Sequence, residues 1–144
     1  MKIIEANLLG MTEGVICHQV NCQGVMGSGI AKQISDKWPE VYDGYMKNCN
    51  KEDLSKSLGL ISYVQVDDNL LVANVFGQDR YGTDRRQTNY GAVAEAFQRL
   101  KYAPGPVYVP YLMGCGLAGG DWDVYSEIIE YFIPDAIVCK WSPS

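Results

Sequence analysis

The glycine-rich stretch of this chain reads Val20-Asn21-Cys22-Gln23-Gly24-Val25-Met26-Gly27-Ser28-Gly29-Ile30-Ala31. It follows residues 15–20, an apolar run typical of a strand, and it leads into a helical pattern that begins near Gly29. Closely spaced glycines let the backbone bend where a side chain would clash, and they let a ligand approach main-chain atoms. The start of a helix adds free N–H groups and the positive end of a dipole. The stretch therefore predicts a site for a phosphate or diphosphate group.

A second glycine-rich loop lies late in the chain and reads Gly114-Cys115-Gly116-Leu117-Ala118-Gly119-Gly120. It also lies between a predicted strand and a predicted helix. In open α/β sheets ligands bind at the carboxyl ends of the strands, and both loops follow strands. We therefore expect the two loops to meet at one edge of the sheet and to hold one ligand from two sides.

The length of 144 residues fits one domain with one core. The hydrophobic fraction of 47% and the charged fraction of 20% are ordinary for a globular protein. The net charge is −5, whereas a general nucleic-acid binder usually carries clustered Lys and Arg. A small anion held by backbone dipoles fits this charge better than a polymer does, so nucleic acid is not an expected partner.

The cellular location is predicted from what the sequence lacks. No apolar run is long enough to cross a bilayer, and the first residues do not form a signal-peptide pattern. These observations predict a cytoplasmic protein with no membrane partner.

The cysteines and the single histidine, His18, argue against a metal site. Five cysteines are present, none of them in a C-x-x-C pair, so a zinc site is poorly supplied. Most of the cysteines lie in or beside apolar runs and are expected to be buried thiols. Cys115, inside the second glycine loop, is either such a thiol or a nucleophile near a helix start.

Hydrophobic periodicity and turn signals predict alternating strands and helices. The predicted strands cover residues 2–7, 14–20, 60–66, 70–76, 107–111 and 136–140. The predicted helices cover residues 29–38, 39–48, 89–101 and 122–132, with Thr88 and Asp121 as N-caps of the last two. A hairpin signal at residues 67–69 interrupts the alternation. This order predicts an α/β fold with a mixed central sheet and helices on both faces.

Both glycine-rich loops resemble the ligand loops of macro domains. The first carries Asn21-x-x-Gly24-x-x-Gly27-x-Gly29-Ile30-Ala31, and the second carries Val109-Pro110-Tyr111-Leu112-Met113-Gly114-Cys115-Gly116-Leu117-Ala118-Gly119-Gly120-Asp121-Trp122. The resemblance covers nearly the whole chain and is greatest to the branch of ADP-ribose-1″-phosphate phosphatases and related phage-like macro domains. It implies a single macro domain over residues 1–144, with three α/β/α layers, a sheet of about six strands and an ADP-ribose cleft above the sheet.

The resemblance implies which residues contact ADP-ribose. The two glycine-rich loops would hold the diphosphate through backbone N–H groups, and Asn21 would reach the distal ribose hydroxyls. The full implied set is Asn7, Leu8, Asn21, Gly27, Ser28, Gly29, Ile30, Gln78, Tyr90, Gly114, Cys115, Gly116, Leu117 and Ala118. No cofactor is implied.

Three positions depart from the family pattern. Macro domains usually place an aspartate after the first strand to accept from the adenine amino group, and the matching residue here is Asn7. The terminal ADP-ribose protein glycohydrolase has a lysine and an acidic residue where this chain has Gln78 and Ala118. Neither side chain supplies covalent or acid–base chemistry, which disfavours glycohydrolase activity.

Two ionisable residues are candidate catalytic groups. His18 lies three residues before Asn21, and in the phosphatase branch a histidine occurs at a similar place. It either protonates the leaving ribose oxygen or is hydrogen-bonded within the core. Asp121 activates a water against the terminal phosphate, caps the last helix, or does both.

Three further side chains have both a ligand role and a structural alternative. Arg80 either pairs with a terminal phosphate or is a solvated loop residue. Tyr90 either lines the pocket or packs under the loop that precedes it. Trp141 either stacks on adenine or covers the edge of the core.

The function expected from this resemblance is hydrolysis of ADP-ribose-1″-phosphate to ADP-ribose and phosphate. The alternatives are a non-catalytic reader of ADP-ribose, free or on modified proteins, and a hydrolase that removes ADP-ribose from macromolecules. A dehydrogenase of the dinucleotide-binding type is disfavoured, because the chain lacks an early G-x-G-x-x-G followed by an acidic residue about 20 residues later.

Overall fold

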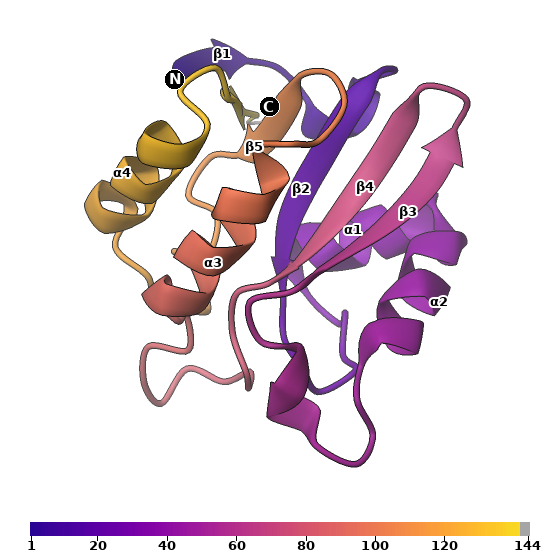
Figure 1. Ribbon diagram of the computed structural model, residues 1–144, viewed down its shortest axis with the longest axis vertical. Helices are drawn as coiled ribbons and strands as arrows, with labels where there is room; N and C mark the ends of the chain where they lie inside the picture. The colour runs from indigo at the N-terminus through magenta and orange to yellow at the C-terminus, as the bar shows by residue number, and fades with distance from the viewer. Residues whose placement is uncertain (142–144) are drawn as a thin grey trace.

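A computed structural model of the chain, which describes residues 1–141, contains one six-stranded sheet in the order β1-β6-β5-β2-β4-β3 (Figure 1). The strands are β1 (Lys2–Glu5), β2 (Gly14–Val20), β3 (Ile61–Asp67), β4 (Leu70–Phe76), β5 (Val107–Pro110) and β6 (Ile137–Lys140). All neighbours pair in parallel except β3 and β4, which form an antiparallel hairpin. The sheet is therefore mixed, as the hairpin signal predicts.

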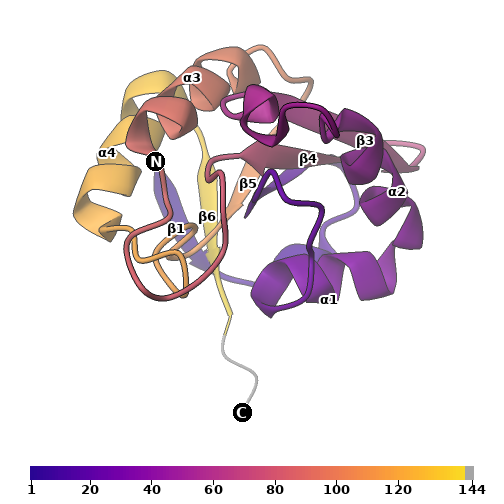
Figure 2. The ribbon, with the colours of Figure 1, turned by 90° about the horizontal axis from the view of Figure 1, so that it is seen from below.

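Helices cover both faces of the sheet, which gives three α/β/α layers (Figure 2). The helices are α1 (Gly29–Lys37), α2 (Pro39–Asn48), α3 (Tyr90–Leu100) and α4 (Trp122–Phe132), with short 3-10 turns η1 (Leu8–Gly10) and η2 (Leu54–Ser57). One hydrophobic core lies between the sheet and α3 and α4, and the other lies between the sheet and α1 and α2. The predicted architecture is confirmed.

β2 is the strand that positions the site. It lies between β4 and β5, parallel to both, and its residues are almost all buried because each face of the strand meets one of the two cores. The carboxyl ends of β2, β4 and β5 lie at one edge of the sheet. The segments that follow these strands therefore meet there.

Two local details differ from the sequence-based expectation. The first strand ends at Glu5 instead of residue 7, because the side-chain oxygen of Asn7 accepts a hydrogen bond from the N–H of Leu9 (3.0 Å) and starts the turn η1. Helix α3 is capped by Asn89 and not by Thr88, because the side chain of Asn89 accepts from the N–H of Ala92 (3.0 Å). The hydroxyl of Thr88 instead serves the site.

Within residues 1–141, no helix is both long enough and apolar enough to cross a membrane.

Candidate functional site

A cleft of about 580 Å³ opens at the carboxyl ends of β2, β4 and β5, a size typical of small-molecule sites. Three segments form its walls: the first glycine loop (residues 21–28) with the start of α1, the polar loop (residues 77–89) and the second glycine loop (residues 114–120) with the turn before it. The lining comprises Gln19, Val20, Asn21, Val25, Met26, Gly27, Ser28, Gly29, Ile30, Ala31, Gln78, Tyr81, Gly82, Thr83, Pro110, Tyr111, Leu112, Met113, Gly114, Gly116, Leu117 and Ala118. The two glycine loops thus face the same cleft, as their sequences predict.

Tyr45 of α2 holds the first glycine loop in place and is fully buried. Its hydroxyl oxygen accepts hydrogen bonds from the N–H groups of Gly24 (2.9 Å) and Val25 (3.1 Å). Its hydrogen lies between the backbone oxygen (2.7 Å) and the side-chain oxygen (2.8 Å) of Asn21. Burial raises the pKa of Tyr45, so the hydroxyl keeps the proton that it donates.

Asn21 lines the cleft with most of its hydrogen-bonding capacity already used. Its side-chain oxygen also accepts from the N–H of Gln23 (2.9 Å), and its Nδ2 donates to the backbone oxygen of Val25 (2.9 Å). One hydrogen of Nδ2 is therefore left for a ligand. A contact between Asn21 and a distal ribose stays a prediction.

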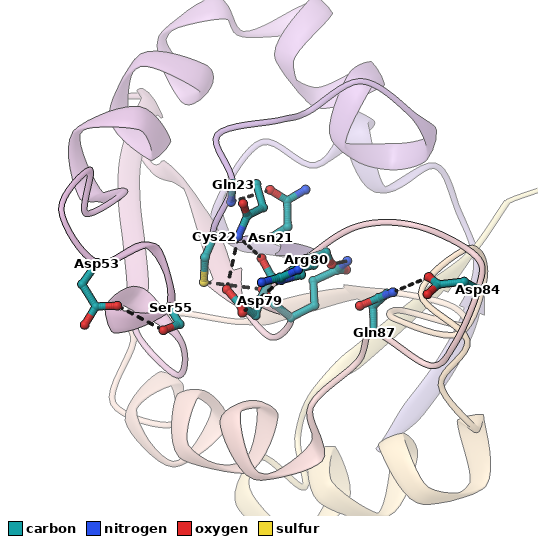
Figure 3. A network of polar contacts seen from close by, with 10 residues as sticks. Asn21, Cys22, Gln23, Asp53, Ser55, Asp79, Arg80, Asp84 and Gln87 are labelled. Atoms are coloured by element: carbon teal, nitrogen blue, oxygen red, sulfur yellow. Dashed lines mark hydrogen bonds and ion pairs between the residues drawn. The ribbon is translucent and has the colours of Figure 1, made fainter.

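The first glycine loop is joined to the polar loop, as Figure 3 shows. The N–H of Cys22 donates to the backbone oxygen of Asp79 (2.9 Å), and the Sγ of Cys22 donates to the backbone oxygen of Gln78 (3.5 Å). Gln23 adds a hydrogen bond from its Nε2 to the backbone oxygen of Asp79 (3.1 Å). These bonds fix the separation of two walls of the cleft.

The start of α1 presents free N–H groups to the cleft. Ser28 is the N-cap residue, and its side chain makes no capping hydrogen bond. Gly29, Ile30 and Ala31 of the first turn line the cleft, and their N–H groups donate to no other group in residues 1–141. Free N–H groups and the helix dipole together favour an anion at this point.

The second glycine loop offers a similar set of donors. Its conformation is fixed by hydrogen bonds from the N–H groups of Gln87 and Thr88 to the backbone oxygen of Ala118 (2.8 and 3.2 Å). The N–H groups of Gly116, Leu117 and Ala118 make no hydrogen bond within the described chain, and all three residues line the cleft. The cleft therefore has N–H donors on two opposing walls.

The cleft lining carries no charged side chain. Among the lining residues, all of which belong to the described part of the chain, there is no Asp, Glu, Lys, Arg or His. Arg80 lies outside the lining, and its exposed side chain is 4.0 Å from the carboxylate of Asp79. Within the lining, the groups that favour an anion are therefore backbone N–H groups.

The structure does not bring His18 to the cleft, which corrects the expectation that it acts as an acid there. Its side chain points from β2 toward α1 and α2 and is fully buried, and its Nε2–H donates to the Oδ1 of Asn74 on β4 (2.5 Å). Nδ1 of His18 and Nδ2 of Asn74 have no hydrogen-bond partner in residues 1–141. Burial lowers the pKa of His18 to about 4, although the bond to Asn74 opposes this shift. His18 is therefore a neutral core residue at pH 7.

Asp121 and Tyr90 are not among the lining residues of the cleft, and their predicted roles toward the ligand stay predictions. Asp121 is the N-cap of α4, where its side chain accepts from the N–H of Asp123 (2.9 Å). The hydroxyl of Tyr90 accepts from the N–H of Asp121 (2.8 Å), and its ring packs under the guanidinium group of Arg86. Both residues support the base of the second glycine loop from outside.

Four other residues that were predicted to contact the ligand or to stack on it lie outside the cleft lining. Asn7 and Leu8 are not lining residues, because Asn7 caps η1 and Leu8 is buried in the core beneath α1. Cys115 is not a lining residue, and its Sγ donates to the backbone oxygen of Met113 (3.3 Å). Burial raises the pKa of Cys115 to about 11, which disfavours a thiolate nucleophile. Trp141 is exposed and outside the lining.

Several lining residues were not predicted from the sequence. Gln19 precedes the first glycine loop, and Tyr111 and Leu112 form the turn after β5. Leu112 has a backbone φ of 62°, a conformation that non-glycine residues rarely adopt and that is found at ligand sites. The only sequence signal for Gln19 is a polar residue at the end of an otherwise apolar strand.

Among the described residues there is no group of three or more His, Cys, Asp or Glu side chains placed to hold a metal ion.

The chain resembles curated proteins at moderate identity. No protein-family model matches it. It is 27% identical to the DNA ADP-ribosyl glycohydrolase of Mycobacterium tuberculosis over 96% of this chain, and it spans 41% of the length of that relative. It is 24% identical to an uncharacterised 17.5 kDa protein of Enterobacteria phage T4, and this match covers 99% of the chain and 97% of the phage protein.

Solved structures share the fold over nearly the whole chain. A Bacteroides thetaiotaomicron protein superimposes with a TM-score of 0.85 at 25% identity, covering 99% of both chains. The macrodomain of Mycobacterium tuberculosis DarG gives a TM-score of 0.75 at 24% identity, covering 99% of this chain and 97% of that one. Thermosipho africanus DarTG in complex with ADP-ribose gives 0.76 at 14% identity, covering 97% of this chain and 41% of that one. The chain therefore has the macro domain fold.

Proposed function

We propose that the cleft binds ADP-ribose through its diphosphate. The observation that carries this proposal is the pair of opposing walls, each with free N–H groups: the start of α1 on one side and residues 116–118 on the other. A diphosphate carries several acceptor oxygens in two directions, so donors on two walls suit it better than they suit a single phosphate. The apolar lining residues, such as Ile30 and Leu112, suit the faces of an adenine or a ribose.

Similarity supports the same ligand. The Thermosipho africanus protein with this fold was solved in complex with ADP-ribose. The curated relatives act on ADP-ribosyl groups attached to DNA. Because the chain spans only 41% of those relatives, the proposal for this chain concerns ADP-ribose itself and does not rest on their whole activity.

A pair of glycine substitutions tests this proposal. Gly116 lines the cleft, and a Cβ placed there meets no heavy atom within 4 Å, so Gly116→Trp adds bulk to the cleft with little strain. Gly10 is equally unobstructed and lies outside the lining, so Gly10→Trp is the matched control. In isothermal titration we expect saturable binding of ADP-ribose to the wild type and to the Gly10 variant, and binding weakened more than about tenfold in the Gly116 variant. No heat with the wild type, or equal binding by both variants, would refute the proposal.

Hydrolysis of ADP-ribose-1″-phosphate, the activity that the sequence resemblance implies, needs a group that moves a proton near the terminal phosphate. His18 is enclosed in the core and Asp121 caps α4, so neither lies in the cleft lining. The terminal phosphate of ADP-ribose-1″-phosphate would also enter a cleft whose lining has no positively charged side chain. We therefore expect ADP-ribose to bind at least as tightly as ADP-ribose-1″-phosphate, with no phosphate released. Phosphate release that His18→Gln and Asp121→Asn abolish would reinstate the phosphatase function.

Removal of ADP-ribose from DNA is the second candidate, and the resemblance to DNA ADP-ribosyl glycohydrolases is what favours it. The absence of acidic and basic side chains from the described lining speaks against it. The test is to incubate the protein with an ADP-ribosylated oligonucleotide and to measure free ADP-ribose. Release by the wild type and by Gly10→Trp, but not by Gly116→Trp, would establish this activity. Binding of the oligonucleotide without release would leave the chain as a reader.

A further inference from the structure

Gln19, near the end of β2, lines the cleft and is the centre of a hydrogen-bond network. Its Nε2 donates to the Oε1 of Gln78 (2.9 Å) and to the Oγ1 of Thr88 (2.9 Å). Its Oε1 accepts from the hydroxyl of Tyr125 on α4 (2.9 Å). Both hydrogens of the amide are thus used within the protein, and none is left for a ligand.

The network extends from Gln19 to two walls of the cleft. The hydroxyl of Thr88, whose residue is 1% exposed, donates to the backbone oxygen of Gly114 (2.6 Å) in the second glycine loop. The Nε2 of Gln78 donates to the backbone oxygen of Arg80 (2.7 Å) in the polar loop. Each bond has a defined direction, because the backbone oxygens of Gly114 and Arg80 can only accept. Thr88 and Gln78 donate to them and so present acceptor oxygens to Gln19, which must point its Nε2 toward both.

The glycines around Gln19 show how closely the two walls approach its amide. A Cβ on Gly77 would lie 2.5 Å from the Oε1 of Gln19. A Cβ on Gly114 would lie 2.8 Å from the same oxygen and 2.6 Å from the Cε2 of Tyr125. Both distances are shorter than packed atoms allow, so a side chain at either position would displace the Gln19 amide. The backbone on either side is thus built around this one amide group.

We propose that Gln19 is a positioning residue for ADP-ribose, one that fixes the Gln78 side chain of the polar loop and the second glycine loop relative to each other. This inference rests on the proposed function. Gln19 acts through groups that line the cleft: the Gln78 side chain, and the loop that carries the N–H groups of residues 116–118. The hydrogen bonds of its amide hold these groups in place before the ligand binds. This lowers the entropy cost of ordering them on binding.

The decisive variant is Gln19→Glu, which keeps the shape and changes the donors. An ionised carboxylate donates nothing, so it loses both Nε2 bonds and repels the Oε1 of Gln78. A protonated carboxyl group regains one donor. Burial raises the pKa of a carboxyl group in such a position, so the change falls in an accessible pH range. Gln65→Glu is the matched control, because Gln65 on β3 also donates through Nε2 to two oxygens, those of Asp67 and Asp68, and is exposed.

The wild-type groups around the network do not titrate in the same range. Tyr125 of α4 belongs to the network, and the thiols of Cys17 on β2 and Cys115 in the second glycine loop are close enough to act on its pKa. Burial raises the pKa of all three, so they stay neutral from pH 5.5 to 8.5. Asp79 and Arg80, beside Gln78, are paired with each other at 4.0 Å. Wild-type affinity is therefore expected to change little over this range.

The experiment is calorimetric titration of ADP-ribose into folded wild type, Gln19→Glu and Gln65→Glu from pH 8.5 to pH 5.5. We expect Gln19→Glu to bind about tenfold more weakly than the wild type at pH 8.5 and to recover most of this loss at pH 5.5. Gln65→Glu is expected to follow the wild type throughout. A Gln19→Glu affinity within about twofold of the wild type at pH 8.5, or a loss that does not change with pH, would overturn the inference.

A second variant keeps the test open if Gln19→Glu does not fold. Thr88→Val removes the hydroxyl that links Gln19 to Gly114 and adds no charge, and we expect it to weaken ADP-ribose binding about three- to tenfold. Unchanged affinity in this variant would contradict the inference. Failure of the wild type to bind would instead contradict the proposed function, so the two failures are distinguishable.

Discussion

His18 is a residue whose burial gives the protein a specific acid sensitivity. Its pKa is about 4 in the folded chain and 6.5 in an unfolded one. As the pH falls below 6.5 the unfolded chain binds a proton that the folded chain does not bind until about pH 4. The free energy of unfolding therefore falls as the pH falls through this window, and it is independent of His18 above the window.

We predict that His18 alone costs the wild type about 2 kcal/mol of stability between pH 7.5 and pH 5, from the linkage of a two-to-three-unit pKa difference. Urea denaturation at the two pH values measures it. His18→Gln removes the titration and keeps a polar side chain beside Asn74, so its loss over the same range should be smaller by this amount. Equal losses in the two proteins would show that the imidazole is not buried in neutral form.

Tyr45 is the second residue with a separable effect. Tyr45→Phe leaves the N–H of Gly24 without its acceptor and the N–H of Val25 with only the longer bond to the Oδ1 of Asn21 (3.5 Å), so we expect a loss of about 1–3 kcal/mol in the free energy of unfolding. The control is Tyr42→Phe, because Tyr42 is partly exposed and donates only to the backbone oxygen of Gly24 (3.1 Å). Urea denaturation of both variants should give a clearly smaller loss for Tyr42→Phe, and a larger one would contradict the role assigned to Tyr45.

The direction of a side chain on β2 could not be predicted from the sequence. A strand that faces water on one side shows alternation of polar and apolar residues, but β2 meets a hydrophobic core on each face. His18 and Gln19 are adjacent and both have polar side chains, so the sequence does not indicate which of them faces the cleft. Only the register with β4 turns His18 toward Asn74 and leaves Gln19 for the cleft.

At the scale of elements, the contact between α2 and β3 depends on one glycine. A Cβ on Gly44 of α2 would lie 2.3 Å from the Cγ2 of Val64 on β3, a β-branched side chain with little freedom to move. We predict that Gly44→Ala destabilises the protein by about 1–3 kcal/mol despite the better helix propensity of alanine. Thermal or urea unfolding measures the change.

A matched control separates packing from propensity. Gly91 of α3 is exposed, and a Cβ there makes only an ordinary contact, at 3.4 Å. Gly91→Ala should therefore be neutral or stabilising. Combining Gly44→Ala with Val64→Ala should remove the clash, so its cost should be less than the sum of the two single costs. An additive double variant would contradict the proposed contact.

The elements themselves were largely predictable because their signals are local. The strands β2 and β4 and the helix α4 begin and end where periodicity and turn residues place them. The predicted N-cap of α3 was wrong by one residue. Thr88 and Asn89 are both good N-cap residues, and the choice depends on Gly114, which is distant in sequence and accepts a hydrogen bond from Thr88. Propensity alone carries no such long-range information.

For the whole molecule, the convergence of the two glycine loops was predictable, because each follows a strand and parallel strands end at one edge. The surroundings of the loops were not. The sequence allows Asp121 to be a catalytic group, a helix cap or both, and the structure shows the cap. The polar loop contributes Tyr81, Gly82 and Thr83 to the cleft, and hydrogen bonds from Cys22 and Gln23 at one end and to Ala118 at the other hold it there.

The most direct test of the central claim is an amide NMR titration of the wild type with ADP-ribose. The account predicts that the N–H signals of residues 29–31 and of residues 116–118 shift together, along one saturation curve, because both sets donate to the same diphosphate. Signals of the α4 N-terminus around Asp121 should move less. Shifts confined to one loop, two unrelated saturation curves, or no shift at all would contradict a single ligand held between the two loops.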